Sequence, residues 1–341
     1  MYVIGGGFSS LIAGKVIPNT QHICFKTKFR SNGIYLQNNK TQIQKLTKSS
    51  YEPIGILRNK LLSTKIKEWL GLGGNSNVWG GFVNTSKIPK SFLKKLKESE
   101  IQLIDLNQEN GYNTSNSKFK QFIYKNEILN VNNLIKNYYD GYVHKLAIKK
   151  NIIEIHIKNN DETKVIKANK VILCLSTLQL IDLLYRSDVI KNNSKITLQE
   201  FLYKIKIRFG FISKEIKNTE AALIRFNFFQ ALLHLVGFQK KLKFTAIFNI
   251  VPIFIEQQFY EKVEIRAFKV KNKSLIELSK HKKIFGHSIH YCNLRINDEN
   301  INSILKKINK NLYGLGMPFC KQKEPGPISN DIISDCLKKF N

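Results

Sequence analysis

The sequence predicts an α/β protein in which a parallel sheet, built from both ends of the chain, carries an inserted and mostly antiparallel sheet. A short apolar strand, Tyr2-Val3-Ile4, runs into the glycine turn Gly5-Gly6-Gly7, and residues 8–16 read as a helix. Residues 22–26 form the next expected strand, so the order of elements is that of a parallel-sheet unit. Residues 196–285 differ, because aromatic-rich strands dominate them, and this favours a second sheet.

The length of the chain indicates its number of domains, and its charge limits the kinds of partner it can bind. A chain of 341 residues exceeds one ordinary compact core and predicts two joined domains. Lysine and arginine number 55 against 25 acids, a formal net charge of +30, yet charged residues total an average 23%. The imbalance therefore reflects scarce acids. Because no compact Lys/Arg block or nucleic-acid motif is present, we expect no nucleic-acid partner. An anionic substrate and peripheral contact with a membrane surface stay open.

The cysteines and the apolar stretches indicate a cytoplasmic protein. The cysteines are odd in number, scattered and without a CxxC pair, which argues against a disulfide framework or a metal site and fits a reducing compartment. They are Cys24, Cys174, Cys292, Cys320 and Cys336. A glycine turn at residue 5 leaves no room for a signal peptide. The most apolar stretch, 244–255, is too short to span a membrane and is broken by Asn249 and Pro252.

The first half of the chain is expected to contain one more helix and a pair of strands. Residues 61–70 have helical apolar spacing and end in a glycine-rich loop at 71–81, whereas residues 101–126 are polar and read as irregular. Residues 142–148 and 152–157 alternate apolar and polar residues on either side of a short turn. This pattern is typical of two paired strands.

The second half is expected to return to the parallel sheet and then to enter the inserted one. Residues 170–175 read as a strand and 178–185 as a helix. The last 55 or so residues return to helix and loop. The inserted sheet is predicted from strands at 205–212, 244–255 and 263–270 around one helix at 221–236.

The glycine turn matches the GxGxxG fingerprint of a dinucleotide-binding loop, with Gly5, Gly7 and Ser10 at its three positions. The first glycine permits the tight turn, the second lets the backbone approach a pyrophosphate, and the third position needs a small residue. The helix N-terminus that comes after it offers N–H groups and a positive dipole end to phosphates. Lys26 is a departure, because the second strand of such a unit should end in an acid that binds a ribose hydroxyl. A purely structural turn is the alternative interpretation of the glycines alone.

A second glycine-rich segment narrows the interpretation. Residues 71–81 read GLGGNSNVWGG and resemble the GG-[ST]-S-x-x-W-G-G loop of the glucose–methanol–choline oxidoreductase family. In that family the loop wraps the pyrophosphate and ring edge of the flavin. Glycines allow close backbone approach and positive φ, while Asn and Ser supply neutral hydrogen-bonding groups. The resemblance implies contacts with FAD from Gly73, Gly74, Asn75, Ser76, Asn77, Trp79 and Gly80.

Further segments are similar to that family and occur in its order. Residues 170–178 look like the strand that returns the chain to the cofactor, with Cys174-Leu175-Ser176 in place of an Ala-Ala-Gly corner. Residues 183–187 match the L-L-x-R-S that comes after it, and residues 141–146 are similar to the strand whose valine backbone touches the adenine. Residues 311–316 resemble the last strand and loop beside the flavin. The resemblance therefore adds Val143, Cys174, Ser176, Gly316 and the second-strand residue Lys26 to the expected FAD site.

The C-terminal part carries the predicted catalytic residues. Residues 287–292 read HSIHYC and resemble the family motif H-x-x-G-T-C, which makes His287 the expected base and His290 the neighbouring candidate. Histidine suits proton transfer because its ordinary pKa of about 6.5 lets modest shifts set either state near neutrality. Residues 325–330 lie where the family has its P-x-x-N-P segment, and Asn330 is the candidate for the second catalytic residue. Histidines that are solvated or satisfied in the core are the alternative interpretation.

The resemblance implies a Rossmann-like FAD-binding domain at 1–195, completed by 286–341, with a substrate domain at 196–285. It also implies an FAD-dependent oxidoreductase that takes hydride from a CH–OH group, with a sugar or sugar conjugate among the candidate substrates and an electron acceptor that the sequence does not identify. Two alternatives stay open. One is a cofactor-poor, non-catalytic descendant of the same fold, and the other is a basic protein that binds a partner or a membrane surface.

Overall fold

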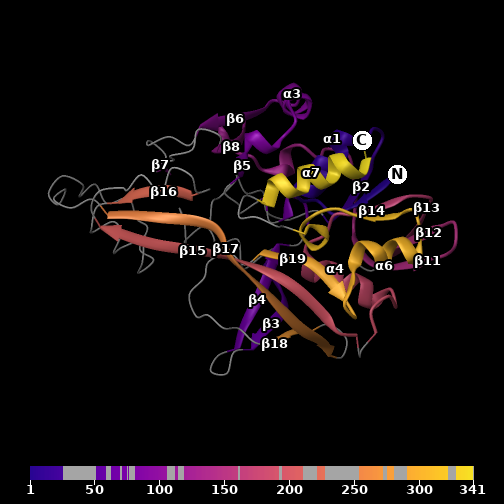
Figure 1. Cartoon of the computed structure of the whole chain (residues 1–341). Coiled ribbons are helices and arrows are strands. Elements are labelled where there is room, and N and C mark those ends of the chain that lie inside the picture. Colours follow the sequence, from indigo (N-terminus) through magenta and orange to yellow (C-terminus); the bar gives the residue numbers. More distant parts are fainter. Residues whose placement is uncertain are drawn as a thin grey trace.

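The computed structural model describes most of the chain. The described residues are 1–25, 51–58, 63–69, 71–74, 76, 81–105, 112–113, 119–159, 162–191, 194–209, 221–226, 253–271, 275–279, 290–321 and 328–340. Within them the chain forms four sheets. Figure 1 shows the longest strands extending away from the end of the molecule that holds both termini.

A five-stranded sheet with the order β10-β2-β1-β14-β21 positions the rest of the fold. Its strands are β1 (Tyr2–Ile4), β2 (Gln21–Cys24), β10 (Tyr138–Asp140), β14 (Val171–Leu173) and β21 (Leu312–Gly314). All neighbours in it pair in parallel. The parallel sheet predicted from both ends of the chain is therefore confirmed, and its central strand is the one that enters the glycine turn.

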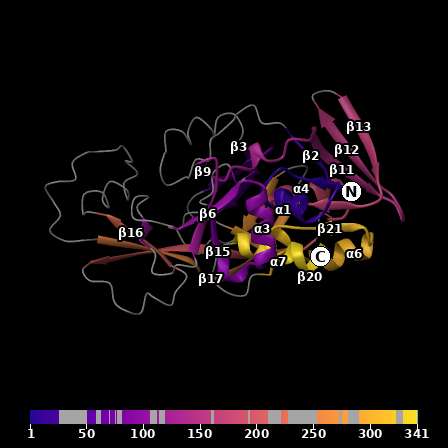
Figure 2. The same cartoon turned by 90° about the horizontal axis from the view of Figure 1, so that it is seen from above.

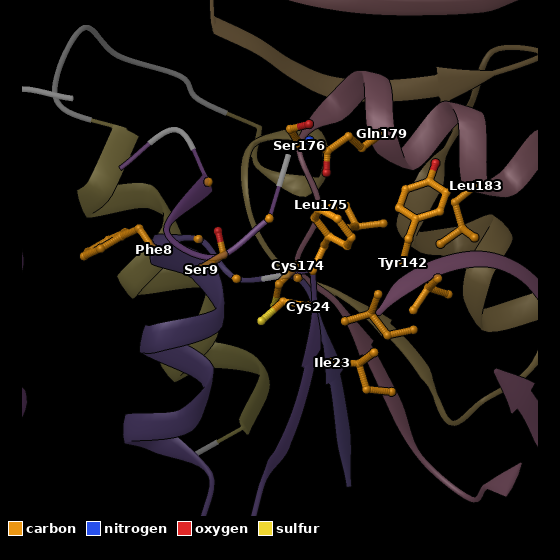
Figure 3. A pocket seen from close by; sticks show the side chains of 18 of the residues that line it. Phe8, Ser9, Ile23, Cys24, Tyr142, Cys174, Leu175, Ser176, Gln179 and Leu183 are labelled. Carbon is orange, nitrogen blue, oxygen red and sulfur yellow. The ribbon is translucent and has the colours of Figure 1, made fainter. Parts of the chain in front are cut away.

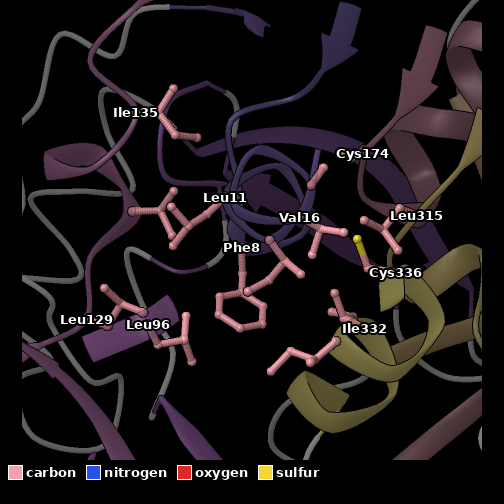
Figure 4. Close-up of a cluster of buried hydrophobic side chains, with 14 of the residues drawn as sticks. Phe8, Leu11, Val16, Leu96, Leu129, Ile135, Cys174, Leu315, Ile332 and Cys336 are labelled. Atoms are coloured by element: carbon pink, nitrogen blue, oxygen red, sulfur yellow. The ribbon is translucent and has the colours of Figure 1, made fainter. Parts of the chain in front are cut away.

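Buried clusters cover the two faces of this sheet, because successive side chains of a strand point to opposite sides. Val3 belongs to a cluster that includes helices on one face, whereas Ile4 belongs to a cluster on the other. The helices of the first cluster are α1 (Phe8–Val16), α3 (Lys90–Glu98) and α7 (Ile328–Phe340), and those of the second are α4 (Thr177–Arg186) and α6 (Ile301–Ile308). Figure 4 shows Val16 of α1 on the side of Cys336 and Ile332 of α7, and Leu11 on the side of Ile135. Burial of each such side chain contributes roughly 1.5–3 kcal/mol.

An antiparallel three-stranded sheet comes after β10 in the chain. It consists of β11 (Tyr142–Ile148), β12 (Ile153–Asn159) and β13 (Glu162–Ala168). Ile153, Ile155 and Ile157 of its central strand are all buried, in alternation with half-buried polar residues. The strands predicted at 142–148 and 152–157 are confirmed. Figure 2 shows this sheet at the opposite end of the molecule from β16.

A small sheet beside α3 replaces the irregular segment expected at 101–126. The strands are β5 (Phe82–Asn84), β6 (Ile101–Asp105), β8 (Phe119–Tyr124) and β9 (Glu127–Ile128), with the 3-10 helices η2 (Thr85–Lys87), η4 (Val131–Asn133) and, elsewhere, η6 (Met317–Phe319). Ile101 of β6 and Phe122 of β8 are buried, so this polar segment still supplies one apolar face. The strands pair with each other, and the apolar face packs against the core.

The fourth sheet is the mostly antiparallel one that the sequence predicts. Its order is β20-β19-β15-β17-β18-β3-β4, with β16 on β17 and β7 on β16. The strands are β3 (Tyr51–Arg58), β4 (Ser63–Trp69), β7 (Tyr112–Asn113), β15 (Ile196–Phe209), β16 (Ala221–Phe226), β17 (Ile253–Lys271), β18 (Leu275–Ser279), β19 (His290–Ile296) and β20 (Glu299–Asn300). β18 pairs with β3 in parallel, and the other pairs of this sheet in the described residues are antiparallel.

Two predictions of a helix from apolar spacing are wrong in the residues that the structure describes. Residues 63–69 of the expected helix at 61–70 form β4, which pairs along its length with β3. Residues 221–226 of the expected helix at 221–236 form β16, which pairs with β17. In both segments pairing with a neighbouring strand outweighs a helical spacing of apolar residues. Among the helices of the described ranges, none has the length and apolarity needed to cross a bilayer.

Candidate functional site

The first glycine turn lies where β1 ends and α1 begins. Gly5 has a φ of 127°, and a Cβ added to it would lie 2.3 Å from the carbonyl oxygen of Cys174. Its N–H donates to the carbonyl of Ile23 at 2.9 Å, and its carbonyl accepts from the Ser10 hydroxyl. A residue with a side chain therefore meets both a backbone atom and an unfavourable φ here. Ser10 closes the turn from within the protein and is not among the described residues that line the neighbouring cavity.

The second glycine segment lies directly on the first, although about 65 residues separate them in the chain. The N–H of Gly73 donates to the carbonyl of Gly6 at 2.7 Å, and a Cβ added to Gly6 would lie 2.9 Å from the Cα of Leu72. The Ser76 hydroxyl donates to the carbonyl of Gly73 and folds the segment back on itself. Positive φ values at Gly71, Gly73 and Gly74 allow this path. The two segments thus form one backbone-built surface.

A cavity of about 380 Å³ opens beside this surface, at the carboxyl ends of β1, β2 and β14. Ligands of open parallel sheets bind at this edge, and small-molecule sites have volumes of about 300–1,000 Å³. Figure 3 shows Phe8 and Ser9 of α1 on one side of it and Tyr142 and Leu183 on the other. Of the residues predicted to bind FAD, those that line it are Gly5, Gly7, Gly74, Ser76, Val143, Cys174 and Ser176.

The helix end at the cavity favours an anion, whereas the charge of Arg186 is paired with Asp182 at 2.6 Å. Arg186 is the one charged side chain among its described lining residues. Burial, and after it the charge of Asp140, raises the pKa of Cys24 to about 12, and burial raises the pKa of Cys174 further. Both thiols in the cavity wall are therefore neutral near pH 7. The N-terminus of α1 adds N–H groups without helical acceptors and the positive end of its dipole.

The described residues fit the phosphates of the expected FAD. A pyrophosphate needs close backbone approach, free N–H groups and no nearby carboxylate. Gly7 supplies the first, because a Cβ added there would meet only Gly73 and Gly74 atoms at 3.8 and 3.9 Å and would otherwise occupy the space beside the turn. The N-terminus of α1, where the N-cap Gly7 gives no side-chain hydrogen bond, supplies backbone donors, and the lining beside it is uncharged.

The C-terminal segments support this arrangement. Gly316 has a φ of 119°, and a Cβ added to it would lie 2.7 Å from the Ser9 hydroxyl oxygen, so the loop after β21 packs against the start of α1. Met317 and Ile328 line the cavity. Gly73 and Gly316 thus stand behind the cavity wall and fix the segments that form it.

Asn330 lies on α7, where its side chain binds backbone rather than the cavity. Its Nδ2 donates to the carbonyl of Asn84 at 2.7 Å, and its Oδ1 accepts from the N–H of Asn84 at 2.9 Å. The neighbouring Ser329 hydroxyl donates to the carbonyl of Phe82. These bonds join α7 to β5, and Asn330 is not among the described lining residues. The structure therefore gives Asn330 a structural contact, and its catalytic role stays a prediction.

The predicted histidines cannot be placed in the same detail. His290 begins β19 and pairs with Phe201 of β15, and its side chain lies outside the described part of the structure. Outside the described residues altogether are Lys26, Asn75, Asn77, Trp79, Gly80 and His287. Their assignments stay predictions.

Of the polar and aromatic residues that line the cavity without having been predicted, three come from β11 and α4. They are Tyr142, Gln179 and Arg186. In the sequence Arg186 stands within the LLYRS match, and Tyr142 is the residue before Val143. Both residues therefore lie inside segments that resemble the family, and this is the sequence signal that could have indicated them.

Comparison with known proteins gives matches in structure and none in sequence. No protein-family model and no curated protein matches the chain. The structure of pyridoxine 4-oxidase from Mesorbium loti is similar with a TM-score of 0.57 and 10% identity, over 99% of this chain and 97% of that one. BexE, studied for oxidation during BE-7585A biosynthesis, is similar with a TM-score of 0.37 and 8% identity, over 98% of this chain and 60% of that one. OxyS anhydrotetracycline hydroxylase from Streptomyces rimosus gives a TM-score of 0.34 and 7% identity, over 98% and 60%.

The first of these matches extends over nearly the full length of both chains. It shows that this chain has the mixed α/β fold of pyridoxine 4-oxidase, with several sheets. The fold class expected from the sequence is confirmed.

Proposed function

We propose that this chain is an FAD-dependent oxidoreductase that oxidises a CH–OH group. The observation that carries the proposal is the contact between the two glycine segments at the N-terminus of α1, beside a cavity at the carboxyl edge of the parallel sheet. The match of the first segment to the dinucleotide-binding fingerprint, the resemblance of the second to the glucose–methanol–choline family, and a fold shared with pyridoxine 4-oxidase support it.

The chain's own residues would hold FAD in two parts. The backbone of Gly7 and Gly74 and the first turn of α1 would bind the pyrophosphate, and Ser76 would add a neutral polar group. The loop at Gly316 would support the flavin end, in line with its position against Ser9. When bound, FAD supplies a two-electron acceptor for the hydride of the substrate.

A histidine would remove the hydroxyl proton of the substrate. His287 is the proposed base and His290 the second candidate, because the HSIHYC segment resembles the family's catalytic motif and leads into β19. On a strand, residues three apart point to opposite sides, so one of the two would face the reacting centre. Asn330 is the weaker candidate for the second polar group, since its amide already binds Asn84.

The substrate would be bound by the second sheet. We propose a substrate domain at 196–285 and an FAD domain at 1–195 and 286–341, and the long antiparallel strands β15 and β17 support that division. Strands β3 and β4 pair onto β18, so residues 51–69 would contribute to the substrate domain as well. The pyridoxine 4-oxidase match and the net charge of +30 favour pyridoxine, sugar alcohols and anionic sugar conjugates as the first compounds to try.

The test has two steps: an absorption spectrum of the protein with FAD, and then reduction of the bound flavin by a substrate alcohol. The purified protein, loaded with FAD, is expected to show absorption bands at about 370 and 450 nm, as bound flavins do. Under anaerobic conditions a substrate alcohol should bleach the 450 nm band, and His287→Ala should retain the bands but lose most of the bleaching. A protein that binds no FAD when it is supplied in excess would be the cofactor-poor descendant instead. Bleaching that is unchanged in His287→Ala would move the base to another residue.

A further inference from the structure

Under the proposed function, the adenosine half of FAD needs a partner that the usual position does not provide. The second strand of a dinucleotide-binding unit normally ends in an acid that binds the ribose. Here no Asp or Glu precedes Glu52, so neither β2 nor the 27 residues from Phe25 to Tyr51 supplies one. Residues of other elements at this edge of the cavity can therefore take part in recognising the nucleoside.

The cavity wall away from α1 is apolar and contains exposed aromatic rings. Ile23 of β2 and Phe25 just after it line this wall, together with Tyr142 and Val143 of β11 and Leu183 of α4. Most large apolar side chains of the described residues are covered, yet Phe25 is 40% exposed and Tyr142 is 37% exposed. An exposed aromatic ring in an apolar cavity is a surface on which a flat base can stack.

Tyr142 is held in one orientation by α4. Its hydroxyl donates to Oδ2 of Asp182 at 3.1 Å and accepts from Nη2 of Arg186 at 2.7 Å. Asp182 and Arg186 are themselves joined at 2.6 Å, one helical turn apart. The guanidinium carbon of Arg186 lies 5.0 Å from the centre of the Tyr142 ring, a cation–π distance. The ring therefore needs no reordering when a ligand arrives, which favours binding.

Arg186 also connects this group to the strand that lines the cavity. Its Nη1 donates to the carbonyl of His144 on β11, so both terminal nitrogens are bound. Its Nε is buried and has no hydrogen-bond partner among the described residues. Arg186 and Tyr142 both line the cavity, so the unpaired donor stands beside the exposed ring.

We propose that Tyr142, fixed by Arg186 and Asp182, is the platform on which the adenine of FAD stacks, so that the nucleoside is held through its base while the acid that would bind its ribose is missing after β2. This assignment rests on the proposed FAD-dependent function. The observation behind it is an exposed, doubly hydrogen-bonded tyrosine at the cavity end opposite the glycine turn. It makes Tyr142 a residue that selects FAD over FMN, because FMN has no adenine to stack.

The test compares Tyr142→Ala with a matched control. Tyr139 lies three residues earlier, is 40% exposed, and carries Lys164 over its ring at 4.5 Å, but it is not among the described lining residues. Dissociation constants for FAD, FMN and AMP are measured by calorimetric titration of the full-length apoprotein. Tyr142→Ala is expected to weaken FAD and AMP binding by about 10- to 100-fold and to leave FMN binding unchanged.

The other variants separate the ring from its support. Tyr139→Ala should change none of the three constants. Tyr142→Phe keeps the ring and loses two hydrogen bonds, so FAD binding should weaken by less than about 5-fold. The dissociation constants of Arg186→Gln for FAD and AMP should both rise, to values between those of Tyr142→Phe and Tyr142→Ala.

The outcomes distinguish this proposal from the function it rests on. A wild-type protein that binds no FAD overturns both. A wild-type protein that binds FAD, with a Tyr142→Ala variant whose FAD constant is unchanged, overturns the adenine platform alone. Equal weakening of FAD and FMN in Tyr142→Ala also overturns it, since a general loss of the cavity would act on both, and the melting temperature of each apoprotein identifies that loss.

Discussion

At the end of the cavity beside α1 the backbone forms the surface, whereas at the end beside α4 side chains form it. The first end consists of Gly5 to Gly7 with Gly71 to Gly74 packed on them, and the polar groups of these residues are backbone N–H and carbonyl groups, joined by the neutral Ser76 hydroxyl. The second end consists of the Tyr142, Arg186 and Asp182 group, which comes from β11 and α4. Both ends open into one cavity.

The difference decides what a substitution does at each end. A backbone surface tolerates no added atom at a point of close approach, so changes there act on the fold or on access to it. A side-chain surface can be trimmed without moving the backbone, so changes there act on affinity. Substitutions at the two ends should therefore differ in kind as well as in size.

The largest effect is expected from Gly5→Ala. The new Cβ would lie 2.3 Å from the carbonyl oxygen of Cys174, at a φ of 127° that residues with side chains avoid. Such strain costs about 1–3 kcal/mol before the backbone contact is counted, so the free energy of unfolding should fall by at least about 3 kcal/mol. Urea unfolding of the apoprotein, monitored by circular dichroism, measures it.

Gly7→Ala is the matched control two residues away. Its Cβ would lie 3.8 Å or more from its nearest neighbours, at a φ of −91° that alanine adopts readily. Stability should change by less than about 1 kcal/mol, while FAD binding should weaken by at least about 10-fold because the methyl group occupies the approach of the pyrophosphate. A Gly7→Ala protein with wild-type FAD affinity would show that this glycine is structural only.

The next effect is expected from Asn330→Ala, which tests the support of the backbone-built end. The change removes both hydrogen bonds to Asn84 and leaves its buried backbone groups without these partners. The free energy of unfolding should fall by about 1–3 kcal/mol. Ser329→Ala, which loses one bond to Phe82, should cost about half as much. If Asn330 were catalytic instead, anaerobic flavin reduction would fall with no loss of stability.

The same contrast explains which parts of the site can be predicted from the sequence. Glycines 5 and 7 can be recognised in the sequence because they occupy the fingerprint positions directly after an apolar strand, and β1, α1 and β14 arise from local apolar patterns. Family resemblance assigns the segment at 71–74 to the same cofactor, and its bond from Gly73 to Gly6 agrees with that. Tyr142 and Arg186 were not predicted as a pair, because 43 residues separate them in the chain. Only the folded structure, in which α4 lies beside β11, brings the two side chains together.

The errors in the fold have a similar origin. Residues 63–69 and 221–226 carry apolar side chains at helical spacing, yet they become strands because β3 and β17 lie beside them. Local spacing cannot show a partner strand that is distant in the chain. The strands within 101–126 were not predicted because their sequence contains few apolar residues. A few are enough to form a strand when only one face of a small sheet is buried.

A smaller effect is expected from Asp182→Asn, at the side-chain-built end. Asp182 and Arg186 are both about three-quarters buried, with exposed side-chain fractions of 22% and 24%. Loss of the charge should lower the free energy of unfolding by about 1 kcal/mol. Asp188→Asn is the control, because its pair with Lys145 is exposed at 71% and 43%, and asparagine accepts its φ of 61°. That variant should show no measurable change, and equal losses in both would contradict a special role for the Asp182 pair.

The smallest effect is expected from pH, and it concerns the phenol of Tyr142 in the cavity wall. Although the Tyr142 side chain is 37% exposed, desolvation in the cavity wall raises its pKa to about 12, with the Asp182 carboxylate adding to the rise and Arg186 opposing it. The folded protein thus holds this proton more tightly than the unfolded chain. The resulting stability is present below about pH 10 and is lost as pH rises toward about 12.

FAD affinity should therefore change by less than about twofold between pH 7 and pH 10, where an ordinary tyrosine would be about half ionised. The glycines of the other end have no side chain that titrates, so they should add no pH dependence of their own. Titrations with FAD at pH 7, 8.5 and 10 measure the affinity in wild type and in Tyr142→Phe. A weakening by pH 10 that is present in wild type and absent in Tyr142→Phe would mean that the phenol ionises early. The hydroxyl would then not be held neutral between Asp182 and Arg186.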